Sequence, residues 1–265
     1  MWPRLGPIPT FAILYSVGIL SHYLVSCLLA RRLGLRRRVW IAVSVCYNVG
    51  MIVGAKSLYD IQHAQFNLRA LFSAERYLAG GLWGGLLAYL CLSVPLALIL
   101  SNRKRAALDL VALSIPIPWI FIKLGCLLNG CCYGRPSSLP WAITFPQGGA
   151  GAPAGIPLHP TQIYEIVVVL CILGVFKVLS KREQWQGTML LWFLILYGLG
   201  RAATEFWRGD ADHHVYVGPL TLSQLICLAA AGVSILVLYL VRCHRPEKRV
   251  TIAEQTPHPF RSESG

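Results

Sequence analysis

The chain has 265 residues, of which 55% are hydrophobic and only 13% charged, and its mean hydropathy is +0.57. This composition excludes an ordinary soluble domain and indicates a polytopic membrane protein, because long apolar runs recur along the whole sequence. The net charge of +13 would suggest a nucleic-acid partner if the charges formed one patch. They lie instead in short connections and in the C-terminal tail, so we expect membrane topology to explain them and no nucleic acid to bind.

Seven apolar runs have about the length, roughly 20 residues, that a helix needs to cross a bilayer. We expect these spans at 8–30, 39–56, 77–101, 107–123, 161–180, 187–207 and 219–241. Arginine and lysine gather in every second connection (31–38, 102–106 and 181–186) and after the last run. The positive-inside rule then predicts an all-α bundle of seven transmembrane helices with the N-terminus outside and the C-terminus inside. Residues 1–241 would form this bundle and residues 242–265 a basic, disordered cytoplasmic tail.

The N-terminal half contains three further signals. The first span follows Arg4 without an obvious small-residue cleavage site, so we interpret it as retained rather than as a signal peptide. The connection 57–76 is mainly polar with interspersed apolar residues, and it could lie as an amphipathic segment in the membrane interface. In the third span, Gly80 and Gly84, like Gly81 and Gly85, place small residues four apart. Close helix packing is the main interpretation, and room for an acyl chain is the alternative.

The connection 124–160 contains the unusual stretch GCLLNGCCYGRPSSLPW, which carries Cys126, Cys131 and Cys132. The other six cysteines lie mostly in apolar runs, where cysteine acts as a small hydrophobe. Adjacent cysteines do not match the usual spacing of zinc ligands, so the sequence predicts no metal site. A disulfide from Cys126 to either neighbour would be compatible with an oxidising outer side. Asn129 and Gly134 favour close backbone approach and amide donors, as a lipid head group requires.

The stretch HPTQIYE enters the fifth span with Gln162 and Glu165 on one helix face. An elaborate N-cap would explain Pro160 and Thr161, but it would not explain a glutamate at membrane depth. His159 is a candidate general base, because the proton affinity of histidine lies nearest neutrality.

The stretch YGLGRAATEFWRG places Tyr197, Arg201, Glu205 and Arg208 on one face of the sixth span. A structural ion pair between Arg201 and Glu205 accounts for part of this pattern. Arg208 would then leave uncompensated positive charge near the outer interface. Guanidinium groups present forked donors to phosphate oxygens, so the pattern favours a phosphate site.

The segments KLGCLLNGCCYGRPSSLPWAITFP (123–146), LHPTQIYE (158–165) and YGLGRAATEFWRG (197–209), in this order, make the chain similar to the bacterial prolipoprotein diacylglyceryl transferase family. The resemblance implies a multi-pass enzyme of the bacterial cytoplasmic (inner) membrane without a cofactor. Its expected partners are phosphatidylglycerol, a preprolipoprotein and membrane lipid. The expected reaction moves the diacylglyceryl group onto the lipobox cysteine thiol and releases glycerol 1-phosphate. The acceptor thiol belongs to the substrate, so the chain's own cysteines need not be nucleophiles.

The resemblance also implies roles for individual residues. Arg201, with Arg208, would stabilise the charge that develops on the departing phosphate, and Glu205 would hold Arg201 in place. The expected catalytic residues are Arg201, His159, Glu205 and Tyr197, and the expected substrate-binding residues are Tyr15, Lys123, Asn129, Gly134, Gln162, Glu165 and Arg208.

The chain departs from the family pattern at several positions. Trp83 stands where many members have a histidine, and Lys123 stands where many have an arginine. Cys126 and Cys131 stand where many have an asparagine and a glutamate. A relative with a different lipid or acceptor therefore stays open as an alternative, as does a non-catalytic seven-span receptor or carrier.

Overall fold

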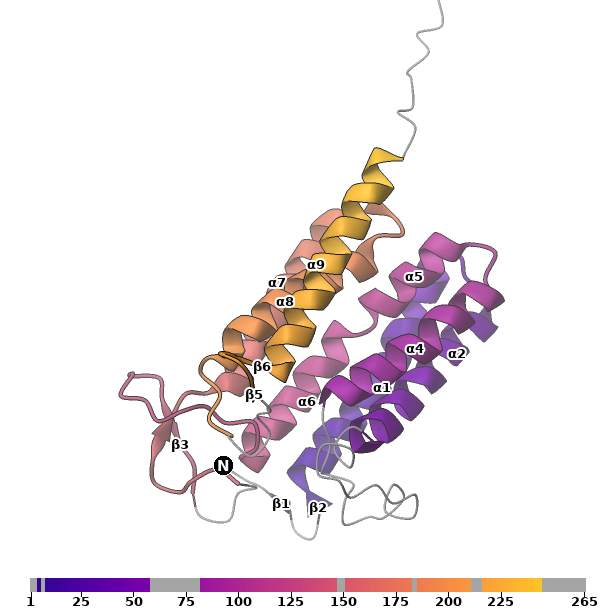
Figure 1. Cartoon of the computed structure of the whole chain (residues 1–265). Helices are drawn as coiled ribbons and strands as arrows, with labels where there is room; N and C mark the ends of the chain where they lie inside the picture. Colours follow the sequence, from indigo (N-terminus) through magenta and orange to yellow (C-terminus); the bar gives the residue numbers. More distant parts are fainter. Residues whose placement is uncertain are drawn as a thin grey trace, which may run out of the picture.

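The computed structural model describes residues 4–5, 8–57, 82–146, 151–182, 185–210 and 216–244. Side chains are described within these ranges except at 4–8, 82–83 and 216–217. Most of the expected interfacial segment 57–76, the glycines at 80 and 81, and the tail beyond residue 244 lie outside the described residues. The described part is a helical bundle with three short two-stranded sheets (Figure 1).

One group of helices comes from the N-terminal half of the chain. Helix α1 (Thr10–Arg32) packs against α2 (Arg37–Val49), which continues into the π-helical turn η1 (Gly50–Gly54). Helix α4 (Leu82–Leu100) packs against both α2 and η1. The second group is α7 (Thr161–Leu179), α8 (Met189–Glu205) and α9 (Leu222–Cys243), which lie side by side in Figure 1.

Two shorter helices connect these groups. Helix α5 (Lys104–Leu113) packs against α4 and α8, and α6 (Pro116–Asn129) packs against α1 and α7. The sequence predicted a span over 107–123, and a stretch long and apolar enough to cross a bilayer runs over Lys104–Asn129. The helix breaks at Ser114 and Ile115, because the rings at Pro116 and Pro118 remove backbone donors and clash with the preceding turn. Helix α6 then continues to Asn129, where Gly130 adopts a left-handed φ of 77° and ends it.

The close approach of η1 and α4 depends on glycine. A Cβ at Gly54 would overlap the carbonyl oxygen of Gly84, and a Cβ at Gly50 would overlap the backbone of Tyr89. Gly85 faces Met51 across the same contact. The predicted role of the third-span glycines in close helix packing is therefore confirmed for Gly84 and Gly85.

Membrane spanning is supported by length and hydropathy. Five stretches are long and apolar enough to cross a bilayer: Thr10–Arg32, Arg37–Ser57, Lys104–Asn129, Thr161–Leu179 and Leu222–Cys243. The apolar helix Gly84–Leu100 and the 17-residue α8 are shorter. The protein is thus a mostly helical, multi-pass membrane protein.

The two ends of the bundle differ in character. At one end the basic connections meet: Arg103 donates to the Leu33 carbonyl at 3.3 Å, and the Arg242 guanidinium lies 3.9 Å from the ring centre of Trp185. At the opposite end lie the short sheets (Figure 1). Strands β1 (Arg4–Leu5) and β2 (Ile8–Pro9), β3 (Ile143–Thr144) and β4 (Pro157–Leu158), and β5 (Tyr216–Val217) and β6 (Leu220–Thr221) form three antiparallel pairs.

Candidate active site

Glu165, in the second turn of α7, is the centre of a buried charge cluster. Its carboxylate accepts from Lys123 Nζ at 2.8 Å and from the Tyr197 hydroxyl at 3.3 Å. The guanidinium groups of Arg201 and Arg208 approach its other oxygen at 3.7 and 3.5 Å. Glu165 is 1% exposed. The structure therefore brings together groups from α6, α7 and α8, and from the turn after α8, that are far apart in the sequence.

Arg201 is held from a second side. It forms an ion pair with Glu205, one turn further along α8. The other Glu205 oxygen accepts from the Thr221 hydroxyl at 3.1 Å, and Thr221 also opens α9 as part of a capping box with Gln224. Gln224 in turn donates to the Ala202 carbonyl at 3.2 Å. The start of α9 thus fixes the end of α8, and with it the direction of the arginine side chain.

Arg208 corrects one expectation from the sequence. Helix α8 ends at Glu205, so Arg208 lies beyond it in a turn rather than on the helix face. Its charge is also not uncompensated, because Asp210 forms a forked ion pair with its guanidinium. The described cluster therefore pairs each of its three cations with at least one carboxylate. Sequence analysis missed Asp210, and its only signal was an acidic residue two positions after the arginine.

The loop that follows α6 (130–146) is tied to the end of α8 by backbone contacts. Gly134 donates to the His159 carbonyl at 2.9 Å and pairs with Arg208 as an antiparallel bridge. Arg135 donates to the Trp207 carbonyl at 2.8 Å, and Gly209 donates to that of Tyr133 at 3.1 Å. A Cβ at Gly134 would collide with His159, which explains the glycine at that position.

The start of α7 holds the same loop through two side-chain hydrogen bonds. The Gln162 amide donates to the Cys131 carbonyl at 2.7 Å, and the Thr161 hydroxyl donates to the Cys132 carbonyl at 2.6 Å. Thr161 was considered as a helix cap, but α7 has no side-chain cap hydrogen bond. The buried amide oxygen of Gln162 has no hydrogen-bond partner in the described part of the chain. It is an acceptor inside the bundle, close to the charge cluster.

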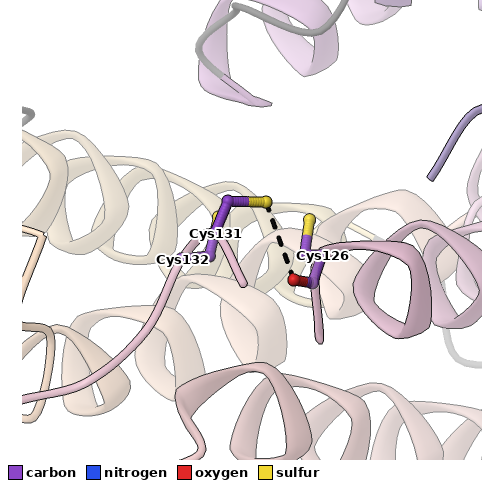
Figure 2. A group of neighbouring side chains, drawn as sticks. All are labelled: Cys126, Cys131 and Cys132. Atoms are coloured by element: carbon purple, nitrogen blue, oxygen red, sulfur yellow. Dashed lines mark hydrogen bonds between the residues drawn. The ribbon is translucent and has the colours of Figure 1, made fainter. Parts of the chain in front are cut away.

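The three clustered cysteines meet at the end of α6. Their Sγ atoms lie within 4.8 Å of one another, and Figure 2 shows them where the helix ends and the loop begins. All nine cysteines of the chain are free thiols, so the structure contains no disulfide from Cys126. Hydrogen bonds from Cys126 and then Cys131 lower the pKa of the Cys132 thiol well below its usual value. Burial opposes that shift, whereas the charges of Lys123 and Arg208 add to it.

His159 lies in an aromatic group at the edge of the loop. Its Nδ1 is 3.0 Å from the Tyr164 hydroxyl, which also accepts from the Trp141 indole at 3.0 Å. Its ring centre lies 6.5 Å from that of Trp207. The histidine is half-buried, whereas the charge cluster is buried. The structure thus places His159 beside the loop residue Gly134, with Nδ1 engaged by a tyrosine.

The remaining candidates lie on the helices around the site. Tyr15 is half-buried on α1, stacked on Phe11 with ring centres 5.9 Å apart. Asn129 ends α6, and its amide lies 3.9 Å from the Cys131 sulfur. Trp83 lies in the first turn of α4, and its side chain is outside the described part.

The fold and the site together define a class: a multi-pass helical membrane protein with a buried charge cluster next to the loop 130–146 at one end. Comparison with known proteins gives the family. The sequence model described as prolipoprotein diacylglyceryl transferase matches residues 4–240. The chain therefore belongs to the prolipoprotein diacylglyceryl transferase family.

Individual relatives bear the same description. The chain is 30% identical over 263 residues to the phosphatidylglycerol–prolipoprotein diacylglyceryl transferase of Rhodospirillum rubrum, covering 92% of each chain. It is 29% identical over 226 residues to that of Geobacter sulfurreducens, covering 82% of this chain and 84% of the relative. The match with the Clostridium tetani protein is 36% over 135 residues and covers 51% of this chain and 53% of the relative.

Proposed function

We propose that this protein transfers the diacylglyceryl group of phosphatidylglycerol to the lipobox cysteine thiol of a preprolipoprotein and releases glycerol 1-phosphate. The observation that carries the proposal is the convergence of three buried cations, Lys123, Arg201 and Arg208, on one carboxylate next to the loop 130–146. The names of the relatives support the same substrates.

The chemistry explains why cations are needed. The acceptor sulfur forms a bond to the terminal glyceryl carbon, and the bond from that carbon to the phosphate oxygen breaks. The thiol loses its proton, and the departing phosphate keeps the bonding electron pair. Negative charge therefore grows on the phosphate as the reaction proceeds, and preorganised guanidinium donors in a buried site stabilise it. Arg201 and Arg208 take this role, and Lys123 adds a third positive charge.

Other residues would position the substrates. Glu205 and Thr221 hold Arg201, and Glu165 orients the Tyr197 hydroxyl. The amide oxygen of Gln162, which has no hydrogen-bond partner among the described residues, suits a hydroxyl of the glycerol head group, because a buried acceptor without a donor is costly. Asn129, Gly134 and Tyr15 would contact the lipid from α6, the loop and α1. His159 takes the thiol proton through the ring nitrogen that Tyr164 does not engage.

The proposal includes the membrane location and the topology of the enzyme. Residues 1–241 would form one domain of seven spans in the bacterial cytoplasmic membrane, with the active-site end outside and residues 242–265 as a cytoplasmic tail. The meeting of the basic connections at the end opposite the loop supports this orientation. The break between α5 and α6 lies inside the fourth of these spans.

The test is a transfer assay with purified protein, labelled phosphatidylglycerol and a lipobox peptide. We expect Arg201→Ala to lose about 10²–10³-fold in kcat, the usual cost of removing one transition-state donor. Arg201→Lys keeps the charge without the forked geometry, so its kcat should lie between that of Arg201→Ala and that of the wild type. The exposed Arg182 provides the control, because Arg182→Ala should transfer at the wild-type rate.

Thermal unfolding in detergent separates lost chemistry from lost folding in each variant. A folded Arg201→Ala protein as active as Arg182→Ala would contradict the role of the cluster. A wild-type protein that transfers no label from phosphatidylglycerol would contradict the proposed substrate. Transfer from another glycerophospholipid in its place would favour the relative with altered lipid preference.

A further inference from the structure

We propose that Cys126, Cys131 and Cys132 form a binding site for one thiophilic metal ion of the zinc class. The sequence argued against a metal because adjacent cysteines do not have the usual ligand spacing. In the fold this spacing does not separate the possible ligands, because the sulfur of Cys126 at the end of α6 lies close to those of Cys131 and Cys132. The site lies next to the charge cluster, but this inference does not depend on the reaction assigned to that cluster.

The distances suit three thiolate ligands. Zinc–sulfur bonds are about 2.3 Å, so three sulfurs around one ion lie roughly 4 Å apart. The three Sγ atoms already lie within 4.8 Å of one another. Cys126 is buried on the last turn of α6, whereas Cys131 and Cys132 are half-buried. An ion could therefore be held with a small adjustment of side chains, and a fourth position would stay open.

The backbone is held so that the sulfurs converge. Gly130 turns the chain at the end of α6, and the Cys131 amide donates back to the Cys126 carbonyl at 3.1 Å. Cys132 adopts a left-handed φ of 58°, the one positive φ among the described non-glycine residues. Such a conformation persists only where the surroundings enforce it. Thr161 and Gln162 do so by hydrogen bonding to the two cysteine carbonyls.

Binding of an ion would leave an anionic site. Three thiolates and a divalent ion carry one net negative charge, and the three thiol protons pass to solvent when the ion binds. Lys123, Arg208 and Asp210 all interact electrostatically with Cys132, so charges of both signs lie near this sulfur. The Asn129 amide lies 3.9 Å from the Cys131 sulfur, and outer donors of this kind commonly orient metal ligands.

The experiment uses the full chain, purified in detergent and reduced. Zn²⁺ is titrated against a chromophoric chelator, and Co²⁺ serves as a spectroscopic probe, because cobalt–thiolate bonds give an intense charge-transfer absorption. We expect one ion per chain and that absorption. Cys126→Ser, Cys131→Ser and Cys132→Ser should each weaken binding by more than the roughly 10–100-fold loss caused by removing an outer partner.

Cys46→Ser is the matched control, because Cys46 is a buried cysteine in the core between α1, α2 and α4. It should bind one ion as the wild type does. Folding of each variant is followed by thermal unfolding. Asn129→Ala should keep the cobalt absorption with about tenfold weaker affinity.

Three results would overturn the proposal. The first is the absence of stoichiometric Zn²⁺ binding to the reduced wild-type protein. The second is binding that all three serine variants retain. The third is a Cys126 disulfide in protein alkylated directly from cells, together with no metal bound after reduction. The proposal is supported if Cys126→Ser, Cys131→Ser and Cys132→Ser lose Zn²⁺ binding while Cys46→Ser keeps it. This result would count whether or not the protein transfers lipid.

Discussion

At the scale of single residues, Glu165 has the largest number of charged partners in the described charge cluster. Lys123, Arg201 and Arg208 all approach its carboxylate. Removing one partner from a buried ion pair is costly, because the remaining charge stays in a medium that solvates it poorly. The carboxylate is therefore as important for holding the cations in the bundle as the cations would be for binding phosphate in the proposed reaction.

We predict that Glu165→Gln destabilises the folded protein by roughly 3–5 kcal/mol and abolishes transfer. Thermal unfolding in detergent and the transfer assay measure the two effects. Replacing both Glu165 and Lys123 by Met should recover part of the lost stability without recovering activity, since it removes a charge of each sign. A double variant less stable than Glu165→Gln would contradict this account.

The sequence allowed much of this cluster to be predicted. Helical spacing placed Tyr197, Arg201 and Glu205 on one face, and the charge of Glu165 at membrane depth marked it as a functional candidate. Its convergence with Lys123 depends on how α6 packs against α7, which no local pattern encodes. Asp210 was missed because it follows the end of α8, where helical periodicity no longer applies.

At the scale of elements, the contact between the end of α8 and the start of α9 controls the position of Arg201. The Thr221 hydroxyl takes part in two interactions: it accepts from the backbone N–H of Gln224 at 3.2 Å, and it donates to Glu205. One side chain thus caps one helix and orients the ion pair of another.

We predict that Thr221→Val costs about 1 kcal/mol of stability, as loss of an N-cap does, and also lowers kcat. The second effect arises because Glu205 loses a donor and Arg201 its fixed direction. Ser223→Ala in the same turn of α9 is the control and should change neither property. A stability loss with unchanged kcat would show that the cap matters and the orientation does not.

The elements themselves were predicted unevenly. All the expected apolar runs contain a helix, because hydropathy reports burial in lipid or core. The π-helical turn at Gly50–Gly54 and the break before α6 were not predicted. The first depends on contact with Gly84, which lies on another helix. Pro116 and Pro118 were a signal of the break before α6. Hydropathy alone does not show it, because the run is apolar on both sides of the break.

At the scale of the whole molecule, the proposed orientation makes a direct prediction. Ser138 is exposed on the site-bearing loop, whereas Cys243 is exposed at the far end of α9. We expect a membrane-impermeant maleimide to label Ser138→Cys in intact spheroplasts and Cys243 only after permeabilisation. Mass spectrometry of the peptides assigns the label to each position. The reverse pattern would invert the topology, and labelling of both in intact cells would exclude it.

The sequence predicted the general architecture because charge and hydropathy are properties of whole segments. The basic connections at 31–38 and 102–106 were expected on one side, and Arg103 indeed contacts the Leu33 carbonyl. The order in which helices pack around α6 could not be predicted, since apolar side chains of similar size line most of the interfaces.

The pairing of every described cation in the cluster with a carboxylate has a consequence for turnover. A phosphate that enters such a site binds by exchange, because each guanidinium hydrogen bond that it gains replaces one that a carboxylate already held. The net affinity for lipid and product is then small compared with the number of contacts. In the proposed reaction the carboxylates would pair again with the arginines once transfer is complete, so that the charged product would leave for water instead of inhibiting the enzyme.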